Sequence, residues 1–259
     1  MIIALLTDFG SRDYYVGAMK GVILSVNAQA IIVDITHEIP PQDIRSAGFT
    51  LRACYKNFPA KTIFAAIIDP GVGSNRRAIL AETENYRFVA PDNGLLSFVF
   101  EEETNFRVFE LTNKKFFAPK VSRTFHGRDI FAPVAAHLSK GMQPNEFGRE
   151  INDFVCFKTA KPVRISETEI EAEIVHADNF GNLITNLRQS DLPENFRLEV
   201  NGEIIERQRK FYAEAAKDEV FIILGSAGFL EISANQNLAQ EILRVRVGEK
   251  ILLKALDKK

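Results

Sequence analysis

Short apolar runs alternate with longer amphipathic segments over the first half of the chain. The apolar runs are rich in β-branched residues and lie at residues 2–6, 31–35 and 63–68. Between them, residues 14–27 and 43–58 carry apolar side chains at helical spacing. Strands that are apolar on both faces and separated by helices are typical of a parallel sheet covered on both sides. The pattern predicts an α/β fold with two crossover helices.

The same pattern continues to about residue 141. Strand-like segments follow at 78–82 and 86–90, and an alanine-rich helix over 129–141 ends at Gly141, a residue suited to stopping a helix. We therefore expect an N-terminal α/β domain over residues 1–160, with a mainly parallel sheet flanked by helices.

From about residue 163 the pattern changes to alternating apolar and charged residues. Such alternation is typical of half-buried antiparallel strands, and Asn201-Gly202 and Gly248-Glu249 supply the turn signals of hairpins. We expect a smaller all-β domain over 163–259, connected to the first by residues 142–162.

Composition and charge narrow the classes of protein. The chain has 259 residues, 46% of them hydrophobic, and a formal net charge of −2 without any basic block. We therefore do not expect this protein to bind a phosphate backbone, and we expect no nucleic-acid partner. Cys54 and Cys156 show no zinc or disulfide spacing, which favours a reducing cytoplasm.

The first ten residues, MIIALLTDFG, lack a basic segment and reach Asp8 after a short apolar run. They predict a first strand and not a signal peptide. No apolar stretch approaches the ~20 residues that a membrane span needs. We expect a soluble protein without a membrane partner.

Five polar segments rich in glycine interrupt the apolar pattern. They are TDFGSRD (7–13), DPGVG (69–73), PDNG (91–94), TFHGRD (124–129) and HADNFGN (176–182). The first two directly follow predicted strands, and open α/β sheets bind ligands at the carboxyl ends of parallel strands. Asp8 and Asp69 are therefore candidate site residues. His126 is another, because Phe125 and Gly127 would place its imidazole on an apolar wall with room beside it.

Structural explanations compete for most of these residues. Asp8 and Asp13 would also suit the cap of a helix that begins near Tyr14, and Asp92 in PDNG is most typical of a turn. Arg76, seven residues after Asp69 across a glycine turn, predicts either an ion pair that holds the loop or a charged group that keeps Asp69 ionised and oriented. The residues alone leave both alternatives open.

Taken together, the polar motifs resemble one known family. TDFGSRDYYVGAMKG, DPGVGSNRR, PDNG, TFHGRDIFAP, DNFGNLITN and GSAGFLEISANQ occur in this order over nearly the whole chain. This ordered set closely resembles the S-adenosyl-L-methionine (SAM) hydroxide adenosyltransferases, relatives of the fluorinating and chlorinating enzymes. The resemblance implies a C-terminal β-barrel-like domain and a homotrimer. It also implies a ligand site between one subunit's N-terminal domain and a neighbour's C-terminal domain.

The reaction that the resemblance implies is hydrolysis of SAM to adenosine and L-methionine by attack of water at C5′, without a metal or other cofactor. Because the sulfonium departs as a neutral thioether, only the water needs help from a base. The family's catalytic trio maps onto Asp69, Arg76 and His126. Which of Asp69 and His126 takes the proton stays open at this stage.

The resemblance also implies binding roles. Asp8 matches a ligand of the ribose hydroxyls, and Ser226 matches a hydroxyl near the methionine or adenine. Asp13, Asp178 and Asn182 match positions that hold the methionine end of the substrate. Phe180 would either stack on the adenine or belong to the core.

Two other kinds of protein remain as alternatives. Asp8, Asp13, Asp69 and His126 as ligands of a divalent metal would suit a hydrolase of phosphate esters, although no paired-metal spacing supports it. A module that senses SAM or adenosine without turnover would use Asp69 and Arg76 only as a structural pair.

Overall fold

The chain divides into two units, Met1–Lys158 and Thr159–Lys259. The structure is a computed structural model, which describes residues 1–256. The last three residues of the predicted C-terminal domain, 257–259, lie outside the described residues.

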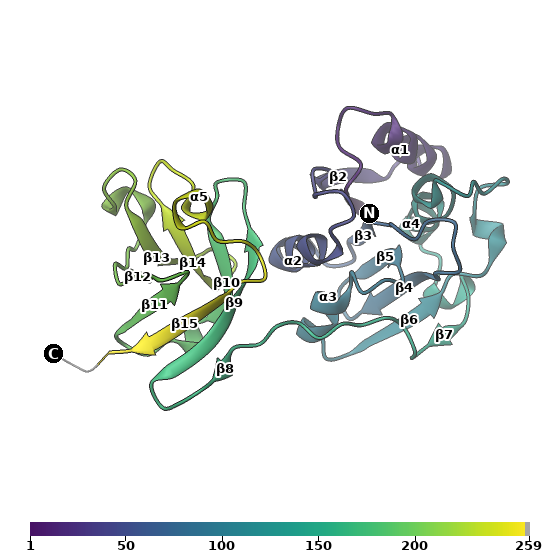
Figure 1. Cartoon of the computed structure of the whole chain (residues 1–259). Helices are drawn as coiled ribbons and strands as arrows, with labels where there is room; N and C mark the ends of the chain where they lie inside the picture. Colours follow the sequence, from purple (N-terminus) through teal and green to yellow (C-terminus); the bar gives the residue numbers. More distant parts are fainter. Residues whose placement is uncertain (257–259) are drawn as a thin grey trace. The chain divides into compact units, whose positions relative to one another are not determined.

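A seven-stranded sheet in the order β2-β1-β3-β5-β4-β6-β7 forms the N-terminal unit (Figure 1). Its strands are β1 (Ile2–Thr7), β2 (Ile31–Thr36), β3 (Ile63–Ile67), β4 (Ala78–Thr83), β5 (Arg87–Pro91), β6 (Phe106–Glu110) and β7 (Glu150–Ile151). The pairings β1–β2, β1–β3 and β3–β5 are parallel, and those of β4, β6 and β7 are antiparallel. The predicted α/β class is confirmed, with a mixed sheet. β4 turns antiparallel because only residues 84–86 connect it to β5, too few for a crossover.

Helices cover both faces of this sheet, as Figure 1 shows. They are α1 (Tyr15–Val26), α2 (Ile44–Cys54), α3 (Ser97–Glu102) and α4 (Ala132–Ser139), with short turns η1 (Tyr55–Asn57), η2 (Lys114–Phe116), η3 (Gly127–Phe131) and η4 (Pro144–Glu146). In β1, Ile3 and Leu5 join the core beneath α1 and α4, whereas Ala4 and Leu6 join the core beneath α2. This alternation explains why the strand is apolar at every position.

The predicted helix over 129–141 forms in two parts. A π-helical turn, η3, precedes the regular helix α4, and the helix ends at Ser139 with Gly141 in the left-handed region at φ +94°. His126 is the N-cap residue of this π-helical turn. A π-turn changes the direction of side chains at a helix start and is common at functional sites.

The C-terminal unit is an antiparallel sheet in the order β12-β11-β15-β9-β10-β14-β13, with β8 paired to β9. Its strands are β8 (Val163–Arg164), β9 (Glu169–Ala177), β10 (Leu183–Arg188), β11 (Phe196–Val200), β12 (Glu203–Ile205), β13 (Val220–Leu224), β14 (Phe229–Ala234) and β15 (Lys250–Ala255), and its short helices are η5 (Gln189–Asp191), η6 (Tyr212–Glu214) and α5 (Ala239–Leu243). After β12, the chain exchanges backbone hydrogen bonds with Ile222 of β13. These bonds nearly close the sheet, so the expected barrel-like antiparallel fold is confirmed.

One of the two predicted hairpin turns is present. Asn201 and Gly202 take φ +50° and +81° between β11 and β12, as a tight hairpin turn requires. The hairpin predicted around Gly248 is wrong, because helix α5 and irregular chain precede β15 there. Ala239 and Leu243 are buried four residues apart, so this segment buries apolar side chains with helical spacing and not with the alternation of a strand.

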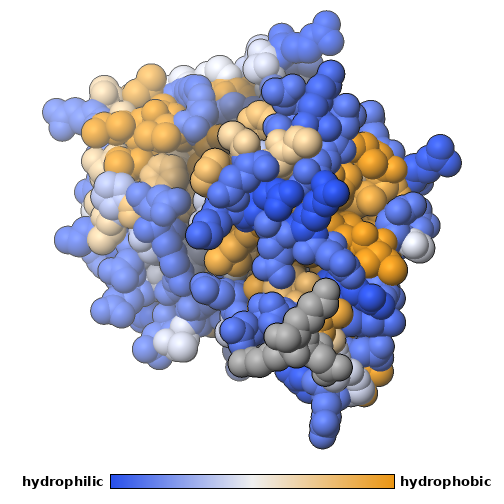
Figure 2. All heavy atoms as spheres, turned by 90° about the vertical axis from the view of Figure 1, so that its left-hand side faces the viewer, coloured by the Kyte–Doolittle hydropathy of each residue, from blue (hydrophilic) through white to orange (hydrophobic). Residues whose placement is uncertain are grey.

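The surface in Figure 2 is mostly hydrophilic, with several separate hydrophobic patches. Large apolar side chains exposed on the C-terminal unit include Val163, Ile165, Phe180, Ile204, Phe211 and Tyr212. Within residues 1–256, none of the helices combines the length and the hydrophobicity that crossing a bilayer requires.

Candidate active site

Asp8 and Asp69 follow two neighbouring parallel strands of the N-terminal unit. β1 and β3 pair in a register that sets Thr7 opposite Ile67, so both carboxylates emerge at the same edge of the sheet. Together with His126 they line a cavity of about 630 Å³. Its other lining residues are Phe9, Tyr15, Pro41, Gln42, Ile67, Pro70, Val72, Thr124, Phe125 and Gly127.

The turn after β3 folds Arg76 back onto Asp69. The Val72 amide donates to the Asp69 carbonyl (3.2 Å), and Gly73 takes φ +77°, a conformation that favours glycine. A Cβ on Gly73 would lie 2.2 Å from the carbonyl oxygen of Arg123, so the turn also packs closely against the loop that leads to His126. Glycine at this position therefore shapes the site.

Arg76 connects Asp69 and His126. Its Nε donates to Asp69 Oδ1 at 2.8 Å and its Nη2 to Oδ2, which makes a bidentate pair. The same Nη2 lies 2.7 Å from His126 Nδ1. The side chains of Arg76 and Asp69 are 10% and 6% exposed, so the pair is largely removed from water. The Arg76 guanidinium also lies 5.2 Å from the ring centre of Phe131.

The contact with Arg76 fixes the form of His126. Arginine has no acceptor, so His126 Nδ1 must accept and the ring proton resides on Nε2. Burial and the Arg76 charge lower the pKa of His126, an effect that the Asp69 and Asp129 carboxylates oppose. The imidazole is therefore neutral at neutral pH.

The buried Asp129 orders the loop that carries His126. It accepts from the Ser122 amide at 2.7 Å and from Arg128 Nε at 2.7 Å. These bonds lower the pKa of Asp129 against the effect of burial, which raises it. Asp129 thus holds the loop in front of the π-turn.

Asp8 and Asp13 take different positions. Asp8 Oδ2 accepts from the Gln42 amide at 2.8 Å and lines the cavity, which leaves Oδ1 for a ligand. Asp13 is exposed and lines neither this cavity nor the cavity around Asp178 in the C-terminal unit. Neither caps α1, because its N-cap residue is Tyr14 and makes no side-chain capping bond.

Asp92 has a structural role, as its turn motif predicts. It accepts from Arg77 Nε at 2.8 Å and from the Val155 amide at 2.7 Å. These bonds tie the end of β5 to the segment near the end of the N-terminal unit.

The remaining predicted residues line a cavity of about 1010 Å³ in the C-terminal unit. Asp178, Phe180, Asn182 and Ser226 all contribute to its wall. Phe180 is 73% exposed, so it does not belong to the core. Asp178 Oδ1 accepts from the amides of Phe180 and Asn182, both at 2.9 Å, and its Oδ2 accepts from Asn182 Nδ2 at 2.8 Å. Asp178 therefore shapes the loop 178–182 as well as facing the cavity.

Glu231 also lines this cavity and escaped the sequence analysis. It lies on β14, where every residue is buried, and is itself 7% exposed. Burial and the nearby Asp178 raise the pKa of Glu231, while a hydrogen bond from Tyr212 opposes the rise. A lone glutamate between apolar residues, as in FLEIS, was the available signal.

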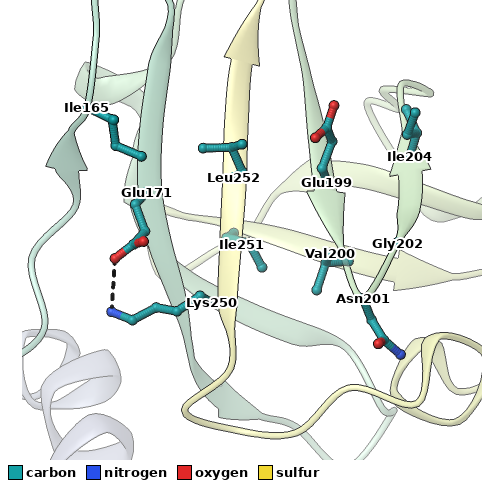
Figure 3. Close-up of a pocket in the computed structure, with 10 residues that line it drawn as sticks. All are labelled: Ile165, Glu171, Glu199, Val200, Asn201, Gly202, Ile204, Lys250, Ile251 and Leu252. Atoms are coloured by element: carbon teal, nitrogen blue, oxygen red, sulfur yellow. Dashed lines mark ion pairs between the residues drawn. The ribbon is translucent and has the colours of Figure 1, made fainter.

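A third cavity, of about 400 Å³, lies on the C-terminal unit and contains none of the predicted residues (Figure 3). Its wall includes Glu171, which is paired with Lys250 at 3.5 Å as the dashed line in Figure 3 shows. Among residues 1–256, no three His, Cys, Asp or Glu side chains gather as a metal site would require.

Comparison with protein families matches both units. A family model described as the SAM hydroxide adenosyltransferase N-terminal domain matches residues 3–148, and one described as the C-terminal domain of the same proteins matches residues 172–252.

Individual relatives agree with this match. The chain is 35% identical over 256 residues to the (R)-S-adenosyl-L-methionine hydrolase of Thermus thermophilus, covering 96% of this chain and 97% of the relative. It is 30% identical over 217 residues to a fluorinase of an Actinoplanes species, covering 74% and 73% of the two chains. A crystal structure of an uncharacterized conserved protein from Thermotoga maritima superimposes with a TM-score of 0.91 at 37% identity, covering 98% of this chain and all of the other.

Proposed function

This chain belongs to the SAM hydroxide adenosyltransferase family, and we propose that it hydrolyses SAM to adenosine and L-methionine at the cluster of Asp69, Arg76 and His126. Water forms the new bond to C5′ while the bond from C5′ to sulfur breaks. Methionine leaves as a neutral thioether, and the water loses its proton. The observation that supports this site best is the bidentate Arg76–Asp69 pair at the edge of a cavity beside a neutral His126.

Asp69 is the base in this proposal. A carboxylate offers about four lone-pair positions, and Arg76 takes two of them, so positions remain for a water in the cavity. His126 Nδ1 is occupied by Arg76 and its Nε2 carries a proton, so the neutral ring donates and does not accept. The water proton therefore goes to Asp69, while His126 orients the network.

Arg76 keeps the base in one orientation. Two donors on a rigid guanidinium fix the carboxylate plane, and in-line attack on C5′ depends on such alignment. A lysine would give one contact in place of two.

Substrate binding divides between the two cavities. Asp8 Oδ1 accepts from the ribose hydroxyls in the first cavity, while Asp178, Asn182 and Ser226 hold the methionine end in the second and Phe180 stacks on the adenine. Asp13 has the weakest support, since it is exposed and lines neither cavity.

Assembly completes the site in the proposal. A homotrimer that sets one subunit's N-terminal cavity against a neighbour's C-terminal cavity would cover exposed apolar residues such as Phe180 and Phe211, which are 73% and 56% exposed. Light scattering should then report three times the chain mass of 29.1 kDa. The proposal includes no cofactor, and a cytoplasmic location is consistent with two unpaired cysteines, Cys54 and Cys156.

Incubation with SAM in oxygen-18 water tests the function. The protein is first stripped of metal with a chelator, and the products are read by mass spectrometry. Adenosine labelled with oxygen-18, together with unlabelled methionine, is the expected result. Intact SAM with measurable binding would favour the sensing module, and activity that returns only with a divalent metal would favour a metal-dependent hydrolase.

A further inference from the structure

His37 links the first two strands of the N-terminal unit through both of its ring nitrogens. Its Nδ1 lies 2.8 Å from Thr7 Oγ1, and its Nε2 lies 3.1 Å from Asp34 Oδ1. Asp34 also pairs with Lys20 of α1 at 2.6 Å. Thr7 is fully buried, and the side chain of His37 is 10% exposed. None of these four described residues lines the cavity beside Asp69, so the proposed mechanism does not yet use them.

A shift in the pairing of β1 with β2 places His37 level with Thr7. The register changes between Leu5 and Leu6 of β1, because β2 contributes one residue more than β1 at that point. Without this extra residue, Thr7 would lie level with Thr36. Bulges are rare in parallel pairs and frequent beside active sites, where they redirect a side chain. The irregularity therefore accounts for the contact between the imidazole and the threonine hydroxyl.

The partners of His37 determine where its ring proton lies. A carboxylate only accepts, so Nε2 carries the proton that faces Asp34, and Nδ1 accepts from the Thr7 hydroxyl. The contact at Nε2 is electrostatic, since its direction is not that of a hydrogen bond. Thr7 Oγ1 in turn accepts from the Phe9 amide at 3.3 Å. The Thr7 hydroxyl is thereby fixed between the imidazole and the turn that follows β1.

This turn carries Asp8. Asp8 lies between Thr7 and Phe9, whose side chain and amide are joined by the hydrogen bond at Thr7 Oγ1. One residue further, the Gly10 amide donates to the His37 carbonyl at 2.7 Å, and Gly10 takes φ +66°. His37 therefore holds the turn on both sides of Asp8, through its side chain on one side and its backbone on the other.

We infer that His37 is a positioning residue for the ribose of SAM, because it fixes Thr7 and so directs the Asp8 carboxylate toward the ribose hydroxyls. This inference rests on the proposed function, which assigns Asp8 to the ribose. A carboxylate accepts from two hydroxyls at once only in the right orientation. The ribose is bound both before and during the reaction, so a misplaced Asp8 should raise the KM for SAM and leave kcat nearly unchanged.

Calorimetry with two nucleosides tests this inference on the full chain. The unaltered protein should bind adenosine at least tenfold more tightly than 2′,3′-dideoxyadenosine, which lacks only the two ribose hydroxyls, since hydrogen bonds to a charged group are strong. His37→Leu should reduce this ratio by about 3- to 10-fold, the range for one lost hydrogen bond. The KM for SAM should rise by a similar factor with kcat within threefold, and the affinity for 2′,3′-dideoxyadenosine should not change.

Two further variants test the connection through Thr7. His37→Asn can place an amide oxygen near the position of Nδ1, so it should restore most of the preference for adenosine. Thr7→Val removes the hydroxyl and should reduce the ratio as His37→Leu does. The double variant Thr7→Val, His37→Leu should lose no more than either single variant, because both remove the same contact. If His37→Leu does not fold, Thr7→Val answers the same question.

A matched control and a separate assay keep the outcomes distinct. His137→Leu makes the same change in the same unit, at a histidine of α4 that packs against Phe116 and lies outside the cavity, and should leave the ratio unaltered. An unchanged ratio in folded His37→Leu would overturn the inference, and so would an equal loss of both nucleosides. Absence of SAM hydrolysis by the unaltered protein would instead overturn the proposed function, since nucleoside discrimination does not depend on turnover.

Discussion

The substitution Asp69→Asn tests whether Asp69 is the base, as we propose. Asparagine keeps the shape of the side chain, and its oxygen can still accept from Arg76 Nε, where Asp69 now accepts at 2.8 Å. The amide nitrogen of the asparagine would face Arg76 Nη2, so two hydrogen-bond donors would meet there. An amide cannot take a proton from water. The substitution therefore removes the proposed base and one of its two hydrogen bonds to Arg76, while the cavity keeps its size.

Two magnitudes follow from this geometry. Loss of a general base lowers kcat by about 10²- to 10⁴-fold, or about 3–5 kcal/mol of barrier. Arg76 and Asp69 are 10% and 6% exposed, and leaving a buried charge without its partner costs about 3 kcal/mol of folding free energy. The melting temperature should then fall by about 10 °C. The KM for SAM should stay within about threefold, because the groups assigned to substrate binding are unchanged.

Steady-state kinetics and thermal melts should be measured together. The double variant Asp69→Asn, Arg76→Met removes both charges, so it should melt above Asp69→Asn alone and remain equally inactive. A double variant that regains activity would show that the single variant failed through instability. If folded Asp69→Asn keeps kcat within tenfold of the unaltered protein, Asp69 is not the base.

Three further predictions concern pH, the turn and Glu231. Burial and the Arg76 charge lower the pKa of His126 below 6.5, and protonation would place a proton on Nδ1, which faces Arg76. We therefore expect kcat to be constant near pH 7 and to fall at lower pH. A pH profile of kcat that stays level under acid conditions would contradict this role of His126. Gly73→Ala should reduce kcat at least tenfold and lower the melting temperature, because φ is +77° and the new Cβ would lie 2.2 Å from the Arg123 carbonyl oxygen; unchanged melting would refute the packing argument. Burial and Asp178 raise the pKa of Glu231, so the ionised carboxylate destabilises the folded protein above that pKa. Without ligand, Glu231→Gln should therefore have a higher melting temperature than the unaltered protein at pH 7. This difference in melting temperature should shrink as the pH falls toward 4.5.

The parts of the fold that follow from local pattern were predictable. β1 and β3 are apolar at successive positions because each face meets a different core, and Asn201-Gly202 forms its hairpin because both residues accept positive φ. The segment before Gly248 was mispredicted, since its alternating charges resemble a strand while Ala239 and Leu243 pack as one helical face. A short apolar run does not distinguish the two-residue period of a strand from the 3.6-residue period of a helix.

The candidate site was predictable only in part. Placement after a strand identified Asp8 and Asp69, and the glycine turn made the Arg76 contact plausible. Nothing local could show that one guanidinium nitrogen also reaches His126, fifty residues further along the chain. Glu231 was missed because a single acidic residue in a strand is usually exposed on the solvent face. Leu230 and Ile232 face the core, and Glu231 lies on the opposite face, where the Tyr212 hydroxyl contacts it.

The geometry of the first cavity also indicates which nucleophile it accepts. In the proposed mechanism, Asp69 places a negative charge beside the nucleophile, and like charges at contact distance repel strongly in a site with little water. Gly127, directly after His126, has no side chain, and a Cβ there would already lie 3.2 Å from Met19 Sδ and 3.3 Å from a ring carbon of Phe9. A larger residue at 127 would have to displace this apolar packing. A neutral water can give a proton to Asp69, whereas a halide would be repelled by the carboxylate and has no proton to give it.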